Sequence, residues 1–131
     1  MFALEPDNQR AAVTTRIVIQ PHEGQAAILS ATQPIVAAIA GTGGGKTVAG
    51  MAWLTLKMVL RPGELWLVVE PTWPMVDRIL LRSSTGRVGL LPLLKVIDPG
   101  TVYHRSDRAI YSKLGTIYLA SATHPESAGI I

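Results

Sequence analysis

The chain has 131 residues, the size of one ordinary domain, and 48% of them are hydrophobic while only 16% are charged. This balance excludes a disordered chain, and the absence of cysteine excludes disulfides and thiolate metal sites. The net charge of +3 is dispersed, so composition alone does not indicate nucleic-acid binding. No apolar run approaches the ~18 residues of a membrane span, and the N-terminus does not resemble a secretion signal. We therefore expect a soluble protein of the cytoplasm with no membrane partner.

The first part of the chain leads up to a glycine-rich segment. Residues 1–20 are predicted to be a lead-in that contains a short strand at residues 15–19. Residues 23–33 carry an imperfect apolar face at helical spacing, which predicts a helix. Proline ends that helix, and the apolar run over residues 34–40 predicts a strand buried in a sheet.

A helix and a second apolar strand are predicted after the glycine-rich segment. Apolar residues recur at helical spacing over residues 48–60, and the sequence Arg61-Pro-Gly-Glu64 breaks this helix. Residues 65–69 form a continuous apolar run, which is typical of a strand covered on both faces in a parallel sheet. Strand, helix and strand in this order predict a βαβ unit with a right-handed crossover.

The remaining chain predicts one helix and several short strands. Proline suits the first turn of a helix over residues 74–83, and residues 84–100 give no clear pattern. Short strands are predicted at residues 101–104, 109–112 and 116–120, the last two joined by a turn at 113–115.

The glycine-rich segment Ala40-Gly-Thr-Gly-Gly-Gly-Lys46-Thr47 fits a phosphate-binding loop, with Ala40 in place of the usual first glycine. Glycines let backbone N–H groups line an anion site, and the following helix adds unpaired N–H groups. Lys46 would reach the β- and γ-phosphates as the catalytic residue, and Thr47 would hold Mg²⁺. The predicted phosphate-binding residues are Gly41, Thr42, Gly43, Gly44, Gly45, Lys46 and Thr47. The alternatives are an ordinary glycine-rich turn and, for Thr47, an ordinary place in the first helical turn.

With its flanking strand and helix, this loop predicts an α/β fold of the P-loop NTPase kind (ASCE, RecA-like). We expect residues 21–131 to form the N-terminal part of such a domain. Its sheet would be mostly parallel, flanked by helices and incomplete. The bound cofactors would be ATP and Mg²⁺.

Three further motifs occur in a characteristic order around the loop. Pro21-His22-Glu-Gly-Gln25 precedes it, Val-Val-Glu-Pro71-Thr72 follows it, and Ser121-Ala-Thr-His-Pro-Glu126-Ser-Ala-Gly129 comes near the end. This order resembles the N-terminal ATPase domain of the large terminase subunit of tailed bacteriophages, the motor that drives DNA into capsids. The resemblance covers about residues 20–131 and implies that Gln25 lies beside the adenine. The residues alone favour equally an exposed polar role for Gln25.

The resemblance also implies partners and a location. In the full-length protein, ATP hydrolysis would drive the translocation of double-stranded DNA. A portal protein and a small terminase subunit would be partners of a homo-oligomeric ring in the cytoplasm of the host cell, encoded by a phage or prophage.

The chain departs from the terminase pattern at the catalytic acids. No Asp-Glu pair of the Walker B kind occurs in the sequence, and no arginine lies in the loop. We therefore expect ATP binding with little or no hydrolysis by these residues, because phosphoryl transfer needs positioned metal and water. Glu70 is a single acid on another strand and is interpreted as structural. Apolar strands at residues 34–40 and 65–69 without neighbours would leave edges prone to association.

Other interpretations stay open at this point. The loop and Pro71-Thr72 also fit a superfamily-2 helicase fragment, and a nucleotide-binding remnant without turnover is a third possibility. Trp53 and Trp66 are interpreted as core residues, whereas Trp73 is a hypothetical DNA contact. Arg78, Arg82 and Arg87 form the only loose basic group, which is equally a solvated helix face.

Overall fold

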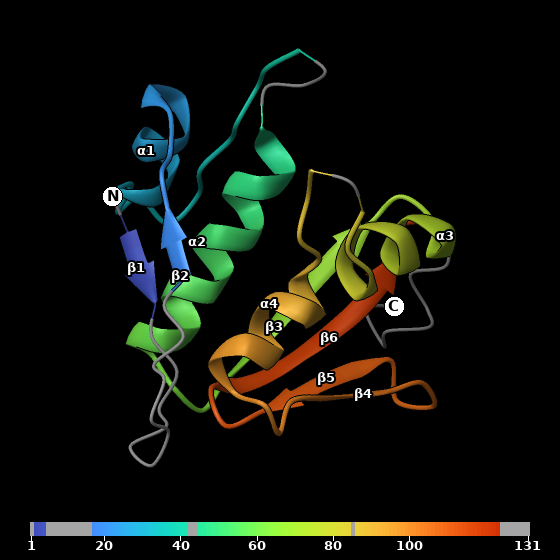
Figure 1. Cartoon of the computed structure of the whole chain (residues 1–131). Coiled ribbons are helices and arrows are strands. Elements are labelled where there is room, and N and C mark those ends of the chain that lie inside the picture. Colours follow the sequence, from blue (N-terminus) through green and yellow to red (C-terminus); the bar gives the residue numbers. More distant parts are fainter. Residues whose placement is uncertain (1, 5–16, 42–44, 85, 124–131) are drawn as a thin grey trace.

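The computed structural model describes residues 2–4, 17–41, 45–84 and 86–123, and it shows an α/β arrangement (Figure 1). A two-stranded antiparallel sheet joins β1 (Phe2–Leu4) to β2 (Ile17–Ile19). A separate four-stranded sheet has the order β3-β6-β5-β4. Its strands are β3 (Glu64–Glu70), β4 (Val102–His104), β5 (Ala109–Ser112) and β6 (Gly115–Ser121). The helices are α1 (Glu23–Leu29), α2 (Lys46–Leu60), α3 (Trp73–Met75), the π-helix η1 (Val76–Leu81) and α4 (Leu90–Ile97).

Most of the predicted secondary structure is confirmed. The helix predicted over residues 48–60 is α2, and the strand predicted over residues 65–69 is β3. The helix predicted over residues 74–83 is α3 continued by η1. The three C-terminal strands are present as β4, β5 and β6, and β5 has the predicted bounds.

Three segments differ from their prediction in extent or type. α1 is shorter than the helix predicted over residues 23–33, because it ends at Ser30, whose hydroxyl donates to the Ala26 carbonyl at 2.7 Å. Residues 84–100, which show no clear pattern in the sequence, contain α4. The lead-in contains a strand pair, β1 and β2, where the sequence predicts only one strand.

The prediction of a mostly parallel sheet is wrong. Only β3 and β6 run parallel, whereas β5 is antiparallel to both β6 and β4. The physical reason is the length of the connections. A turn at Lys113 and Leu114 joins β5 to β6, and so short a connection permits only antiparallel pairing.

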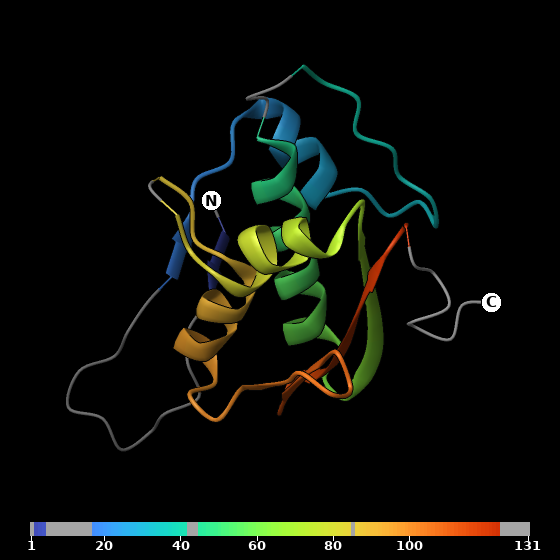
Figure 2. The same ribbon diagram turned by 90° about the vertical axis from the view of Figure 1, so that its right-hand side faces the viewer.

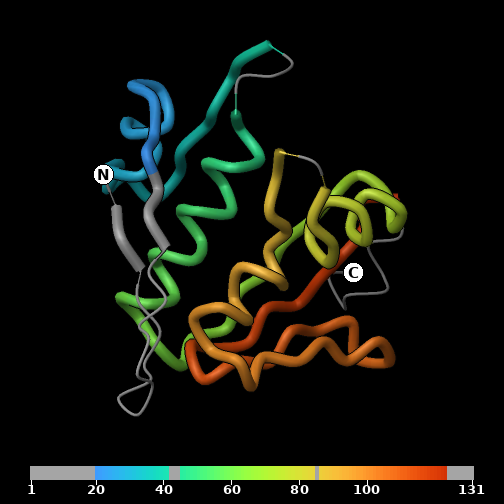
Figure 3. The backbone as a smooth tube through the Cα atoms, in the orientation of Figure 1, coloured from blue at the N-terminus to red at the C-terminus, as the bar shows by residue number. Residues whose placement is uncertain are grey.

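The strand predicted over residues 34–40 is not formed, so the predicted βαβ unit is also wrong. Figure 3 follows this segment from the end of α1 to the beginning of α2, outside the four-stranded sheet. Ile35 and Ile39 are 88% and 97% exposed. A strand depends on ladder hydrogen bonds to a neighbour, and in the described part of the chain β3 pairs with β6 alone. An apolar run without such a neighbour stays outside the sheet.

The hydrophobic core lies on one face of the four-stranded sheet. Figure 2 shows α2, η1 and α4 on the same side of the sheet. Buried core residues come from all three helices and from β5 and β6: Met51, Leu54, Met58, Val76, Leu80, Leu90, Leu94, Ile110, Ile117 and Leu119. The rings of Trp53 and Trp66 meet edge to face at 6.2 Å and pack against this core, which confirms the core role predicted for both.

The opposite face of β3 is uncovered, contrary to the prediction that both faces are buried. Leu65, Leu67 and Val69 are 70%, 50% and 48% exposed, and they alternate with the half-buried Trp66 and Val68. Tyr118, the β6 partner of Leu67, is exposed on the same face. Among the described residues β3 pairs with β6 alone, so the strand that was expected to lack neighbours has one neighbour and one open edge. Among the described residues, no helix has the length and apolar character needed to cross a membrane.

Asp98 fixes the junction between α4 and the β-hairpins, although its side chain is buried. One carboxylate oxygen accepts from the Gly100 N–H at 3.1 Å, and the other accepts from the Ser112 hydroxyl at 3.1 Å and the Lys113 N–H at 2.9 Å. Burial raises the pKa of the Asp98 carboxyl, but these three hydrogen bonds and the Lys113 charge together bring the pKa below its ordinary value. The folded chain therefore favours the ionised form of the Asp98 carboxyl.

We expect Asp98→Asn to destabilise the fold at neutral pH by about 1–2 kcal/mol, because an amide cannot accept all three hydrogen bonds. A carboxyl whose folded pKa is depressed stabilises the fold above its unfolded pKa, and this contribution disappears as pH falls through the folded pKa. The difference between the two proteins should therefore shrink below a pH of about 4. Urea denaturation of both proteins across this pH range measures it, with Glu64→Gln, an exposed carboxylate, as the control. An equal pH dependence for the Asp98 variant and the unmutated chain would contradict this role.

Candidate nucleotide site

The loop ends at Gly45, which begins α2 in the left-handed region with φ 77° and ψ 18°. Only glycine adopts this conformation without strain. Lys46 and Thr47 are the first two residues of α2, and both are exposed. The helix therefore presents its unpaired N–H groups and its positive dipole end at the loop, as an anion site requires. The predicted residues Thr42, Gly43 and Gly44 lie outside the described residues.

The Lys46 ammonium group turns back onto the loop. It donates to the carbonyl oxygen of Ala40 and to that of Gly41, the latter at 3.2 Å. Carbonyl dipoles hold the cation at the position where the chain turns into α2. A phosphate would be a stronger acceptor than either carbonyl, because hydrogen bonds between ionised partners are stronger than those to neutral groups.

Gln25 links α1 to the residue that precedes α2. Its Nε2 donates to the Gly45 carbonyl at 3.0 Å, and its Oε1 accepts from the His22 N–H at 3.2 Å. A carboxamide has two N–H donors and two acceptor lone pairs, so these bonds use one of each. One donor and one acceptor stay available, the pair that an adenine edge requires.

The contact between Gln25 and Gly45 leaves no room for a side chain at position 45. A Cβ on Gly45 would lie 2.4 Å from Gln25 Nε2. Gly41 is different, because a Cβ there would meet no atom within 4 Å. The two glycines therefore have different structural requirements, although both belong to the predicted loop.

A cavity of about 320 Å³ adjoins these residues, near the lower end of the ~300–1,000 Å³ that ligand pockets span. α1 contributes Gln25 and Ile28 to its wall, residues 36–40 contribute another side, and Gly45 and Lys46 close it. The lining is mainly apolar, with the side chains of His22, Gln25 and Lys46 as polar exceptions. An aromatic base fits such a wall, and the ammonium group stands where an attached phosphate would follow.

Thr47 faces a second cavity, of about 310 Å³, between α2 and β3. Glu70 lines the same cavity, at the end of β3. Burial raises the pKa of the Glu70 carboxyl, and the charge of Arg87 opposes part of this effect. Within the described residues, no three His, Cys, Asp or Glu side chains gather as metal ligands. A metal at this position would therefore rely on the Thr47 hydroxyl and on ligands from outside the described chain.

Two of the remaining motifs meet in the structure. The Ser121 hydroxyl at the end of β6 donates to the Pro71 carbonyl at the end of β3, at 3.3 Å. Thr72 accepts from the Met75 N–H at 3.4 Å and so begins α3. Residues 124–129 of the third motif lie outside the described residues. The sequence order thus brings together the ends of the parallel strands β3 and β6, on which ligand sites of α/β sheets are commonly built.

His22 is a site residue that the sequence analysis did not assign. Its Nδ1 accepts from the Gln25 N–H at 3.3 Å while its own N–H donates to Gln25, so the two residues form a capping box. His22 also lines the 320 Å³ cavity. The spacing of a capping residue and a glutamine three positions later is a signal that could have found it.

The described geometry thus combines a left-handed glycine, a lysine at a helix N-terminus and a glutamine held against them. The glutamine comes from a helix 20 residues before the glycine and the lysine, which are neighbours in the sequence. No known protein family, no curated protein and no solved structure gives a significant match to this chain.

Proposed function

We propose that this chain is the ATP-binding part of a viral DNA-packaging motor of the terminase large-subunit kind, with a P-loop NTPase fold. In this proposal Lys46 and Gly41–Gly45 bind the phosphates, Thr47 contributes to Mg²⁺ binding, and Gln25 contacts the adenine. Mg²⁺ would neutralise phosphate charge when bound. In a longer protein, ATP hydrolysis would drive double-stranded DNA translocation in a ring assembled with a portal protein and a small subunit.

One observation carries this proposal, the hydrogen bond from Gln25 Nε2 to the Gly45 carbonyl at 3.0 Å. The capping box with His22 holds the Gln25 side chain at the start of α1, and the bond to Gly45 adds a contact with a segment 20 residues later in the chain. The contact places an amide with a spare donor and acceptor in the wall of the cavity that Lys46 also lines. This arrangement suits a ligand that carries both a base and phosphates.

Hydrolysis requires more than binding. An attacking water must be positioned and polarised, and the sequence has no Asp-Glu pair for that role. Glu70 shares its cavity with Thr47, not with Lys46. We therefore propose binding without appreciable turnover by these residues alone.

The test is equilibrium binding of a fluorescent ATP analogue with Mg²⁺ to the chain and to Lys46→Ala, with hydrolysis followed in the same samples. We expect Lys46→Ala to bind roughly 10- to 100-fold more weakly, because a charge-assisted hydrogen bond contributes about 1.5–3 kcal/mol. Lys95→Ala, which removes an exposed lysine from α4, is the matched control and should bind like the unmutated chain. Neither the unmutated chain nor the two variants should hydrolyse the analogue at an appreciable rate.

A third variant, Gln25→Ala, separates base recognition from phosphate binding. It should reduce the preference for the ATP analogue over the GTP analogue while keeping the dependence on Lys46. Absence of binding by the unmutated chain, or equal binding by Lys46→Ala, would refute the proposal for this chain. Unchanged base preference in Gln25→Ala would refute the adenine role alone.

A further inference from the structure

A broad cavity of about 760 Å³ lies at the end of the sheet where α3 and η1 meet the turn between β4 and β5. Arg82, Arg105 and Arg108 line it together with the aromatic residues Trp73 and Tyr103. These residues come from two stretches of sequence, 73–82 and 103–108, which meet only in the fold. The cavity is separate from the one that adjoins Lys46, and the two share no lining residue.

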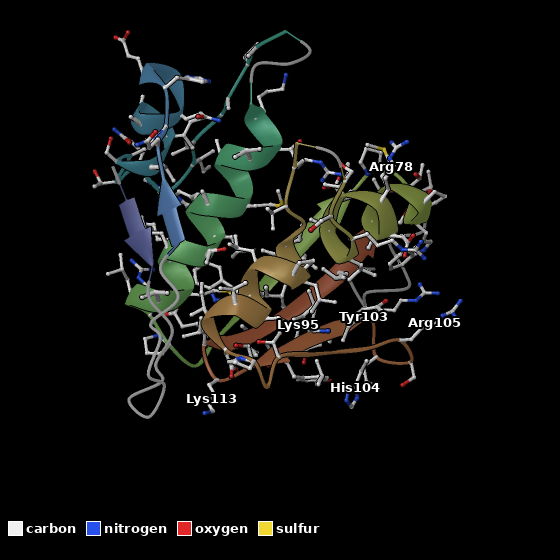
Figure 4. The ribbon with its side chains drawn as sticks, in the orientation of Figure 1. Arg78, Lys95, Tyr103, His104, Arg105 and Lys113 are labelled. Carbon is white, nitrogen blue, oxygen red and sulfur yellow. The ribbon has the colours of Figure 1, made fainter. Side chains whose placement is uncertain are left out.

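The positive charge at this cavity is only partly neutralised. Arg82 forms an ion pair with Asp77 at 3.2 Å, and both side chains are well exposed, so water screens the pair. Arg105 is exposed and forms no hydrogen bond or ion pair with any described residue. Figure 4 shows Arg105 extending away from the sheet on the same side as Arg78.

Arg87, by contrast, is used within the fold. Its guanidinium donates to the carbonyls of Arg78 and Ile79, each at 2.9 Å, at the end of η1. The basic group suggested by the sequence (Arg78, Arg82 and Arg87) is therefore not the one that the structure assembles. The β4–β5 turn supplies the other two arginines.

Arg108 is fixed against Trp73. Its guanidinium carbon lies 4.1 Å from the centroid of the indole ring, and its backbone takes the left-handed conformation with φ 51°. Such a conformation is uncommon for a residue with a side chain. The stacked arginine occupies one face of Trp73, so that face is closed to a nucleobase. The N–H groups of the guanidinium lie along its edge and can donate hydrogen bonds to a phosphate oxygen.

From this arrangement we propose that the cavity formed by Arg82, Arg105 and Arg108 binds the phosphate backbone of double-stranded DNA. Arginines from separate elements suit a polyanion with repeating phosphates, and the occupied Trp73 ring argues against stacking of unpaired bases. The proposal deepens the proposed function, on which its choice of DNA as partner rests. In this proposal DNA contacts Arg108, which is stacked on Trp73, and does not contact the Trp73 ring itself.

The test is fluorescence anisotropy of a labelled duplex of about 20 base pairs, titrated with the chain between about 50 and 200 mM salt. With about three phosphate contacts the affinity should fall roughly 40-fold over this range, since each contact contributes about −0.9 to the logarithmic slope. Arg105→Ala combined with Arg108→Ala should leave roughly a 3-fold fall. Arg61→Ala combined with Lys113→Ala removes the same charge elsewhere and should keep the full salt dependence. Figure 4 shows Lys113 at the far end of the sheet from Arg105.

Two further variants guard against a trivial outcome. Arg105→Ala alone changes an exposed side chain and should lower the slope by about one contact without affecting the fold. Arg108→Lys keeps the charge but loses the planar stacked group, so it should bind duplex more weakly than the unmutated chain. Circular dichroism of each variant confirms that it is folded.

Several results would overturn the proposal. These are absence of duplex binding, equal losses in the arginine pair and the control pair, and tighter binding of a single strand of the same length. Binding of the ATP analogue is measured on the same samples and should be unchanged in both pairs. If the unmutated chain binds the ATP analogue but no duplex, this inference alone is refuted, and if it binds duplex but no ATP analogue, the nucleotide site alone is refuted.

Discussion

Gly115→Ala is expected to destabilise the fold by about 2–5 kcal/mol, because backbone strain and a backbone collision act at the same position. Gly115 begins β6 with φ 142°, where a side chain is strained. A Cβ there would also lie 2.5 Å from the Glu64 carbonyl oxygen, a backbone atom that cannot turn away. Gly115 pairs with Glu64 in the parallel ladder and with Ser112 in the hairpin, so both pairings would shift. Urea denaturation measures the loss.

Gly63→Ala is the matched control for Gly115→Ala. Gly63 also has a positive φ, 88°, but a Cβ there would meet no atom within 4 Å. Its substitution by alanine should therefore lower the free energy of unfolding only through backbone strain, by about 1–2 kcal/mol. If the two variants were equally stable, the close approach to Glu64 would have no energetic importance.

The second large effect is expected at the proposed nucleotide site, where Gly45→Ala should weaken binding of the ATP analogue tenfold or more, a change of about 1.4 kcal/mol for each tenfold. The left-handed φ of 77° costs about 1–2 kcal/mol for alanine, and the new methyl group collides with the Gln25 amide. Relieving the backbone strain or the collision would rotate the Gly45 peptide, whose carbonyl accepts from Gln25. Equilibrium titration of the analogue measures the loss.

Gly41→Ala is the control within the same loop, because a Cβ at position 41 meets no atom within 4 Å. It should affect binding much less than Gly45→Ala. A double-mutant cycle then separates strain from collision. In a Gln25→Ala background the collision is gone, so Gly45→Ala should cost less than in the unmutated chain. An equal cost in both backgrounds would show that Gln25 does not limit position 45.

Local patterns predicted most of the secondary structure correctly. β5 and β6 follow from short apolar runs around the turn at Lys113 and Leu114, and α2 follows from helical spacing ended by Arg61-Pro-Gly. In each case the signals lie within the element or at its ends. Short-range sterics and hydrogen bonding decide such elements, so one sequence contains enough information.

Sheet topology depended on interactions that a local pattern does not contain. Residues 34–40 are as apolar as β3, yet only β3 has a neighbour to pair with, which is β6. The prediction assumed that an apolar run implies a buried strand, whereas burial requires a partner. The antiparallel pairing of β5 with β6 agrees with the turn predicted between them, whereas the parallel pairing of β6 with β3 joins distant segments and has no local signal.

The contacts at the candidate sites also divide into those with a local sequence signal and those that depend on the fold. The place of Gln25 beside the adenine, which the resemblance implies, stays a prediction, whereas its contact with Gly45 is known only from the structure. The pairing of His22 with Gln25 was missed, although its spacing is local. The stack of Arg108 on Trp73 could not be predicted from the sequence, because it depends on where the β4–β5 turn meets α3.

The uncovered face of β3 has a consequence for how the protein behaves at high concentration. Leu65, Leu67 and Val69 present apolar surface to other molecules, and the net charge of only +3 gives weak mutual repulsion. Because the isoelectric point is near 9.6, the repulsion grows as pH is lowered and vanishes as pH approaches 9.6. Colloidal stability of the chain is thus controlled by charge, and acidic to neutral buffers of low ionic strength are its natural storage conditions.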